Sequence, residues 1–132
     1  MPKKQLVPES LSFQPRPAFP YSPGAAAGGF IYTAGQVAWG PDGELVAIGD
    51  IRGQTRQTLQ NVLAVLTEGG AKPSDVLKCN VYLANIERDF QAMNEEFAKV
   101  FPDAPPARTT VQAPMASPEM LVEIEAIAYI GQ

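Results

Sequence analysis

One arginine and two glutamates near the end of the chain have the types and spacing to act on a ligand that carries a carboxylate. Arg108 stands at the start of an extended run, and its planar guanidinium can bind a carboxylate through two parallel hydrogen bonds. Glu123 and Glu125 alternate with apolar residues, so their carboxylates share one strand face, roughly 7 Å apart. The alternative is a solvated outer face with an unrelated arginine nearby, and the pattern alone leaves both open.

An alternation of strands and helices must position these residues, which indicates an α+β fold in a single domain over 1–132. Strands are marked by β-branched and aromatic residues, and helices by apolar spacings of three and four. The proline-rich residues 1–18 are predicted to form an extended arm. The other predicted elements are a strand over 30–37, a helix over 51–69, a strand over 76–84, a helix over 87–101, a strand over 108–113 and a strand ending at 130.

Asn94 lies inside the apolar stripe of the second predicted helix, where a polar side chain must find hydrogen-bond partners. We expect it to brace a neighbouring loop or to meet another subunit. The stripe consists of Phe90, Met93, Phe97, Val100 and Phe101. In the strand over 76–84, the residues expected on one buried face are Leu77, Cys79, Val81 and Leu83.

Right-handed connections would place both helices on one face of a mixed sheet. The chain would leave the other face uncovered, and a bare face of mixed polarity favours self-association. Polar residues on that face are expected to line clefts between subunits. The side chains predicted there are Tyr82, Arg108, Thr110, Leu121, Glu123 and Glu125.

The composition excludes several classes of site. The chain contains no histidine, which rules out His-based triads and the usual zinc sites, and its one cysteine, Cys79, is expected to be a buried hydrophobe. A net charge of −4 without a cluster of Lys or Arg predicts no nucleic-acid partner. Because no signal-peptide core or membrane-spanning apolar run is present, we expect a cytoplasmic protein without a membrane partner.

From Tyr21 onward, nearly the whole chain resembles the RidA/YjgF family of enamine and imine deaminases. No single segment is specific, but their order and spacing together are. The matching segments are 20–22 (Pro-Tyr-Ser), 32–36 (Tyr-Thr-Ala-Gly-Gln), 49–51 (Gly-Asp-Ile), 54–57 (Gln-Thr-Arg-Gln), Asn61, 92–95 (Ala-Met-Asn-Glu), 106–109 (Pro-Ala-Arg-Thr) and 122–128 (Val-Glu-Ile-Glu-Ala-Ile-Ala).

The resemblance implies a chorismate-mutase-like α+β fold and a homotrimer, with the sheets in an inner barrel and active sites between subunits. Family members hydrolyse reactive 2-enamines and 2-imines, such as 2-aminoacrylate, to the 2-keto acid and ammonia. The resemblance therefore predicts a 2-iminobutanoate/2-iminopropanoate deaminase-like hydrolase. Its ligand would be a small imine, enamine or keto acid, and it would require no metal or organic cofactor.

The resemblance also implies roles for matched residues. Arg108 would bind the substrate carboxylate, and Glu123 would position and activate the attacking water. Tyr21 would form one wall of the pocket. Asn94 would support the site without contacting the substrate, or would lie at the subunit interface.

Three further residues are expected to line the substrate, two of them where this chain departs from the family pattern. The backbone of Gly35 and of Thr110 would hydrogen-bond the substrate. Many members have Ser in place of Ala34 and Cys in place of Thr110, so this pocket lacks one hydroxyl donor and differs in shape. Many also have Gln-Ala where this chain has Pro23-Gly24.

Two other classes of function remain open. One is a non-catalytic trimer that binds keto acids or similar metabolites through Arg108 and acts on a partner protein. The departures at Ala34 and Thr110 favour it, whereas the retained Glu123 counts against it. The other is a ribonuclease or translation inhibitor, which the acidic balance and the lack of histidine disfavour.

Overall fold

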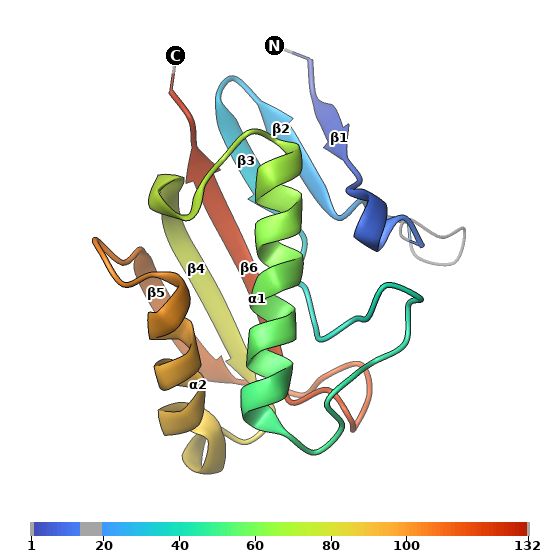
Figure 1. The fold of residues 1–132 in the computed structure, drawn as a ribbon, viewed down its shortest axis with the longest axis vertical. Coiled ribbons are helices and arrows are strands. Elements are labelled where there is room, and N and C mark those ends of the chain that lie inside the picture. Colours follow the sequence, from blue (N-terminus) through green and yellow to red (C-terminus); the bar gives the residue numbers. More distant parts are fainter. Residues whose placement is uncertain (1, 14–19, 132) are drawn as a thin grey trace.

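The structure, a computed structural model, describes residues 2–13 and 20–131, which form a mixed sheet with two helices on one face (Figure 1). The strands are β1 (Lys4–Leu6), β2 (Gly24–Ala27), β3 (Phe30–Thr33), β4 (Val76–Leu83), β5 (Ala107–Gln112) and β6 (Val122–Tyr129). Their order across the sheet is β1-β2-β3-β6-β4-β5; β4 and β5 are parallel, and the other neighbours are antiparallel. The predicted α+β class is therefore confirmed.

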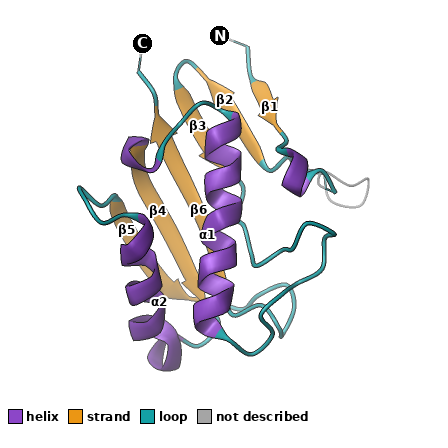
Figure 2. Ribbon diagram, viewed as in Figure 1, coloured by secondary structure: helices purple, strands orange, loops and turns teal. Residues whose placement is uncertain are grey.

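Both helices start at a residue whose side chain caps the first turn. The helices are α1 (Ile51–Glu68) and α2 (Ile86–Val100). Asp50 accepts a hydrogen bond from the Gly53 amide at 3.1 Å, and Asn85 accepts one from the Arg88 amide at 3.0 Å. Such caps satisfy amides that lack a partner within the helix. Figure 2 shows both helices in front of the same sheet face, as the crossover rule predicts.

The core lies between this face and the helices. The alternation of β6 directs four buried residues towards the helices, as predicted: Val122, Ile124, Ala126 and Ala128. The facing helix residues include Leu59, Val62 and Leu66 of α1, and Met93 and Phe97 of α2. Cys79 is fully buried among them, and burial raises the pKa of its thiol to about 12, which confirms a hydrophobic role.

The prediction that Leu77 lies on the buried face of β4 is wrong. A β-bulge between Val76 and Lys78 shifts the register against β6, so Val76 is buried and Leu77 is 53% exposed. A bulge places an extra residue in one strand and thereby reverses the faces on one side of it.

The N-terminal arm belongs to the sheet and the core rather than to solvent. β1 pairs with β2, Leu6 and Leu11 are buried, and a short 3-10 helix covers Glu9–Leu11. The part of the predicted arm at 14–18 lies outside the described residues.

β2 was not predicted, because its sequence Gly-Ala-Ala-Ala has low intrinsic strand propensity. It forms a hairpin with β3 through Gly28 and Gly29, whose φ angles of 59° and 88° suit a tight two-residue turn.

Within the described residues, neither α1 nor any other helix is long and apolar enough to cross a membrane.

Candidate active site

Arg108 and Thr110 lie on the sheet face that carries the helices, not on the uncovered face where they were predicted. β5 pairs in parallel with β4, which places Arg108 beside Cys79 and Thr110 beside Val81. Paired residues point to the same side of a sheet, and both partners are buried under the helices. The register of a parallel edge strand decided the face, and the pattern within β5 carried no information about it.

The Arg108 guanidinium lies against α2. Its Nη2 donates to Asn94 Oδ1 at 2.5 Å, and its Nη1 approaches the Met93 sulfur at 3.8 Å. Asn94 thus braces an arginine rather than a loop. Burial lowers the pKa of Arg108, but an arginine remains a cation at neutral pH.

No acidic side chain among residues 2–13 and 20–131 pairs with Arg108. The salt bridges in this part of the chain use Arg52, Arg56, Arg88 and Lys99. The guanidinium instead borders a shallow groove of about 810 Å³, which leaves a charged donor facing an apolar surface. The groove is lined by Asn94, Phe97, Ala98, Phe101, Pro102, Pro105, Pro106 and Arg108.

Glu123 lies on the uncovered face, as predicted, and Gly35 lies against it. Pairing with Tyr82 of β4 places Glu123 on this face. A Cβ atom at position 35 would lie 2.9 Å from the carboxyl carbon of Glu123 and closer still to one of its oxygens. Only glycine therefore fits at position 35 with Glu123 in this position, which explains the glycine in the segment that follows β3.

The surroundings of Glu123 favour its neutral form. Burial raises the pKa of its carboxyl, and the nearby charge of Glu125 raises it further. Glu125 is held in place, because Asn80 Nδ2 donates to it at 2.9 Å. A carboxyl with a raised pKa is suited to exchange a proton with a reacting group near neutral pH.

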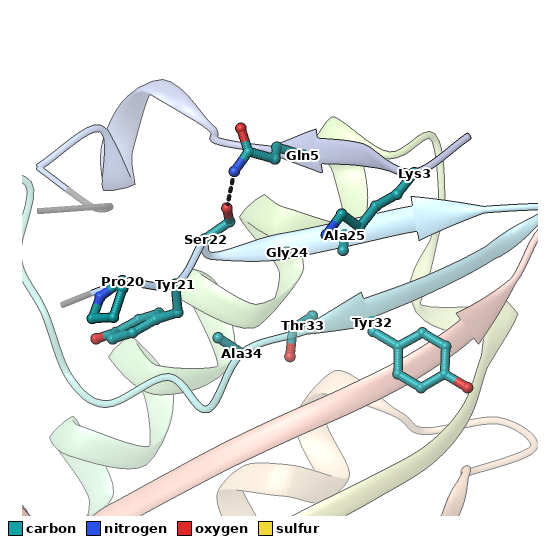
Figure 3. Close-up of a pocket in the computed structure, with 10 residues that line it drawn as sticks. All are labelled: Lys3, Gln5, Pro20, Tyr21, Ser22, Gly24, Ala25, Tyr32, Thr33 and Ala34. Atoms are coloured by element: carbon teal, nitrogen blue, oxygen red, sulfur yellow. Dashed lines mark hydrogen bonds between the residues drawn. The ribbon is translucent and has the colours of Figure 1, made fainter.

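Tyr21 and Ala34 line one hollow of about 480 Å³ (Figure 3). It lies at the β1–β2–β3 end of the sheet, and the Gln5 amide donates to Ser22 Oγ at 2.7 Å beside it. The lining residues are Lys3, Gln5, Pro20, Tyr21, Ser22, Gly24, Ala25, Tyr32, Thr33 and Ala34. The next residue after Ala34 is the glycine that contacts Glu123, so the hollow and Glu123 are connected through one short segment.

A single chain does not bring Arg108 and Glu123 together. They are two strands and three residues apart in the sheet, roughly 14 Å between Cα atoms, and their side chains lie on opposite faces. The predicted residues therefore form two groups. The first group lies on the α2 side and consists of Arg108, Asn94 and Thr110. The second group lies around Glu123 and consists of Glu123, Gly35, Ala34 and Tyr21. No small ligand reaches both within one chain.

Two buried polar residues of α1 hold the loops beside Glu123, and sequence reasoning assigned them no role. Gln54 donates to the Glu119 carbonyl at 2.8 Å and accepts from the Leu121 amide at 2.9 Å. Asn61 donates to the Val37 carbonyl at 2.9 Å. These bonds fix the chain two residues before Glu123 and two residues after Gly35. The sequence feature that could have indicated this role is the pair of polar residues seven positions apart on one face of the helix.

Within the described part of the chain, no three His, Cys, Asp or Glu side chains are grouped closely enough to hold a metal ion.

Comparison with known proteins places this geometry in a family. The family model described as Endoribonuclease L-PSP matches residues 12–130. A RutC family protein of Pyrococcus horikoshii is 43% identical over 115 residues, which are 87% of this chain and 90% of the relative.

Two solved Escherichia coli structures share the fold. The YjgF gene product is 32% identical with a TM-score of 0.84, and covers 97% of this chain and 99% of its own. TdcF with bound serine is 30% identical with a TM-score of 0.85, over the same shares of the two chains. The chain therefore belongs to the RidA/YjgF family, whose family model is called Endoribonuclease L-PSP.

Proposed function

We propose that this protein hydrolyses 2-imino acids, and the 2-enamino acids from which they arise, to 2-keto acids and ammonia. The observation that carries the proposal is the pair of incomplete half-sites. Arg108 has no acidic partner in the described chain, and Glu123 has a raised pKa against a glycine on the opposite face of the sheet. A carboxylate binder and a proton-transfer group are what hydrolysis of an imino acid requires.

Arg108 supplies the binding energy for the carboxylate common to these substrates. Met93 and Asn94 each accept one contact, from Nη1 and Nη2 respectively. The remaining N–H groups are available for two parallel bonds to a carboxylate. The backbone of Thr110, two residues further along β5, is the predicted second contact.

Glu123 performs the proton transfers. As a carboxylate it accepts a proton from water while the water oxygen bonds to the imine carbon. The resulting carbinolamine loses ammonia when Glu123 returns the proton to nitrogen and the C–N bond breaks. The hydroxyl proton passes to the Glu123 carboxylate as the carbonyl forms, and ammonia then takes it up as ammonium. Because imines already react with water, positioning by Arg108, Tyr21 and the Gly35 backbone supplies much of the acceleration.

The complete site requires a second copy of the chain in this proposal. Arg108 at the β5 edge of one subunit would meet the Glu123 group of its neighbour in a homotrimer. The uncovered face supports self-association, because it exposes Phe30, Tyr32 and Tyr129 at 42%, 53% and 40%. A chain with unused large apolar side chains on one sheet face gains free energy by burying them.

A second candidate is ligand binding without turnover. TdcF has been crystallised with bound serine, so a relative with 30% identity binds a small amino acid. In this chain Ala34 removes a hydroxyl from the Glu123 group, which would weaken chemistry more than binding. We expect no RNA activity despite the family model's name, and RNA binding that weakens steeply with salt would contradict that expectation.

A coupled assay separates these candidates. An amino-acid oxidase or threonine dehydratase generates imines from a panel of amino acids, and keto-acid formation is followed with and without the protein. We expect acceleration that Arg108→Ala abolishes and Arg108→Lys restores poorly, since lysine lacks the fork. Binding of 2-oxobutanoate to the wild type without acceleration for any imine would instead establish the binding module.

A further inference from the structure

One side of α2 forms a binding surface for the Arg108 guanidinium, called here the cradle. Phe90, Met93, Asn94 and Phe97 are spaced i, i+3, i+4 and i+7, so they lie on one side of the helix. All four contact the Arg108 guanidinium. A stripe of this spacing ordinarily packs only a core; here Met93 and Phe97 belong to the core and also contact a cation.

The guanidinium lies over two aromatic rings. Its Cζ atom is 5.8 Å from the centroid of Phe90 and 4.9 Å from that of Phe97. The two phenylalanines are seven residues apart, which is roughly 10.5 Å along the helix axis. The guanidinium is therefore within cation–π distance of one ring on each side of Met93 and Asn94 along the helix sequence.

Phe90 contributes little to the core. It is 40% exposed, whereas Phe97 is 5% exposed and also packs on Phe101 with ring centroids 4.8 Å apart. An aromatic face attracts a guanidinium electrostatically without using any of its N–H donors. The rings therefore restrict Arg108 while its outer N–H groups remain available.

We propose that Phe90 and Phe97 are positioning residues that hold the Arg108 guanidinium with its outer edge presented to the substrate carboxylate. The proposal rests on the proposed function for its ligand, but the cradle is a property of the ligand-free protein. An arginine on an edge strand loses side-chain entropy when it binds a carboxylate, and a cradle removes part of that loss beforehand.

The test compares the full-length wild type with Phe90→Leu, Phe90→Tyr and a control, Gln91→Ala, at an exposed neighbouring position of α2 without a contact to Arg108. Leucine keeps an apolar side chain but removes the ring, and tyrosine restores the ring. The first readout is the Nε–H NMR signal of Arg108 without ligand, identified by its loss in Arg108→Lys. The second is the Kd for 2-oxobutanoate by calorimetry, with KM and kcat where turnover is observed.

We expect Phe90→Leu to move the Arg108 signal towards that of solvated arginines and to raise Kd and KM about three- to tenfold, with kcat within about twofold. Phe90→Tyr and Gln91→Ala should match the wild type, and thermal unfolding of all three should be unchanged. An unmoved Arg108 signal in Phe90→Leu overturns the cradle, and so does a moved signal with an unchanged Kd. If the wild type neither binds nor turns over, the proposed function fails while the NMR readout still decides the cradle.

Discussion

The two residues expected to perform chemistry differ in what surrounds them. Arg108 is braced by Asn94 but has no acidic partner in the described chain, and Glu123 is partly buried with a second carboxylate nearby. Each group thus has a charged form that is costly without a ligand: the Arg108 cation has no acidic partner in the described chain, and burial and Glu125 disfavour the Glu123 carboxylate. Such residues are candidates for function rather than for stability.

Glu125→Gln should move the acid limb of the pH profile to lower pH. Burial first, and then the charge of Glu125, raise the pKa of Glu123. Activity requires ionised Glu123, so kcat/KM falls as pH drops through that pKa. Removing the charge at 125 lowers the pKa and moves the limb down.

The profile is measured in the coupled assay between pH 4 and pH 8. Glu68→Gln, an exposed glutamate at the end of α1, controls for the change in net charge. An acid limb that stays in place in Glu125→Gln would show that another group controls it.

At the scale of elements, one buried glutamate joins α1 to α2, the helix that contacts Arg108. Glu96 of α2 has a side chain 1% exposed and accepts from Arg52 and Arg56 of α1 at 3.2 and 3.1 Å, and from Lys99 at 3.2 Å. Its burial opposes ionisation, but the bonds from Lys99, Arg56 and Arg52 outweigh it and lower the pKa of Glu96. The glutamate therefore stabilises the α1–α2 contact as an anion.

Glu96→Gln should destabilise the protein by about 1–2 kcal/mol at pH 7, the lower range for hydrogen bonds to charged groups because the cationic partners are exposed. A depressed pKa contributes stability above the ordinary glutamate value of 4.5 and loses it as pH falls through the folded-state value. The difference from wild type should thus shrink in acid.

Urea unfolding at pH 7 and pH 3 measures both effects. Glu95→Gln is the matched control, since Glu95 also pairs with Arg52, at 2.7 Å, but is 49% exposed. Equal losses at positions 95 and 96 would contradict the role assigned to burial.

Elements with strong periodicity could be predicted from the sequence, and those defined by pairing could not. The two helices, the alternation of β6 and the polar Asn94 in the α2 stripe all follow from local patterns. The three-residue β1 and the alanine-rich β2 form only because a neighbouring strand is available.

The division of the candidate site residues between the two faces of the sheet could not be predicted from the sequence. Which face Arg108 occupies depends on the register of β5 beside β4, a contact between residues far apart in the sequence. The bulge that exposes Leu77 is likewise set by pairing with β6. No pattern within a strand encodes either feature.

At the scale of the whole molecule, a single chain is an incomplete structure for the chemistry proposed. The helices cover one sheet face, and the other face carries exposed aromatic residues beside Glu123 and Glu125. A closed cyclic assembly would cover this face and bring the Arg108 edge of one subunit to the Glu123 group of the next.

Subunit mixing tests this central claim most directly. Arg108→Ala and Glu123→Gln chains are produced separately and together, and the coupled assay is run on each preparation after mass spectrometry has verified mixed trimers. Each variant alone should be inactive. With random assembly, about three quarters of trimers are mixed and each holds one intact site in three, so the co-produced sample should recover about a quarter of wild-type activity. Mixed trimers that remain as inactive as the two parents would contradict a site shared between subunits.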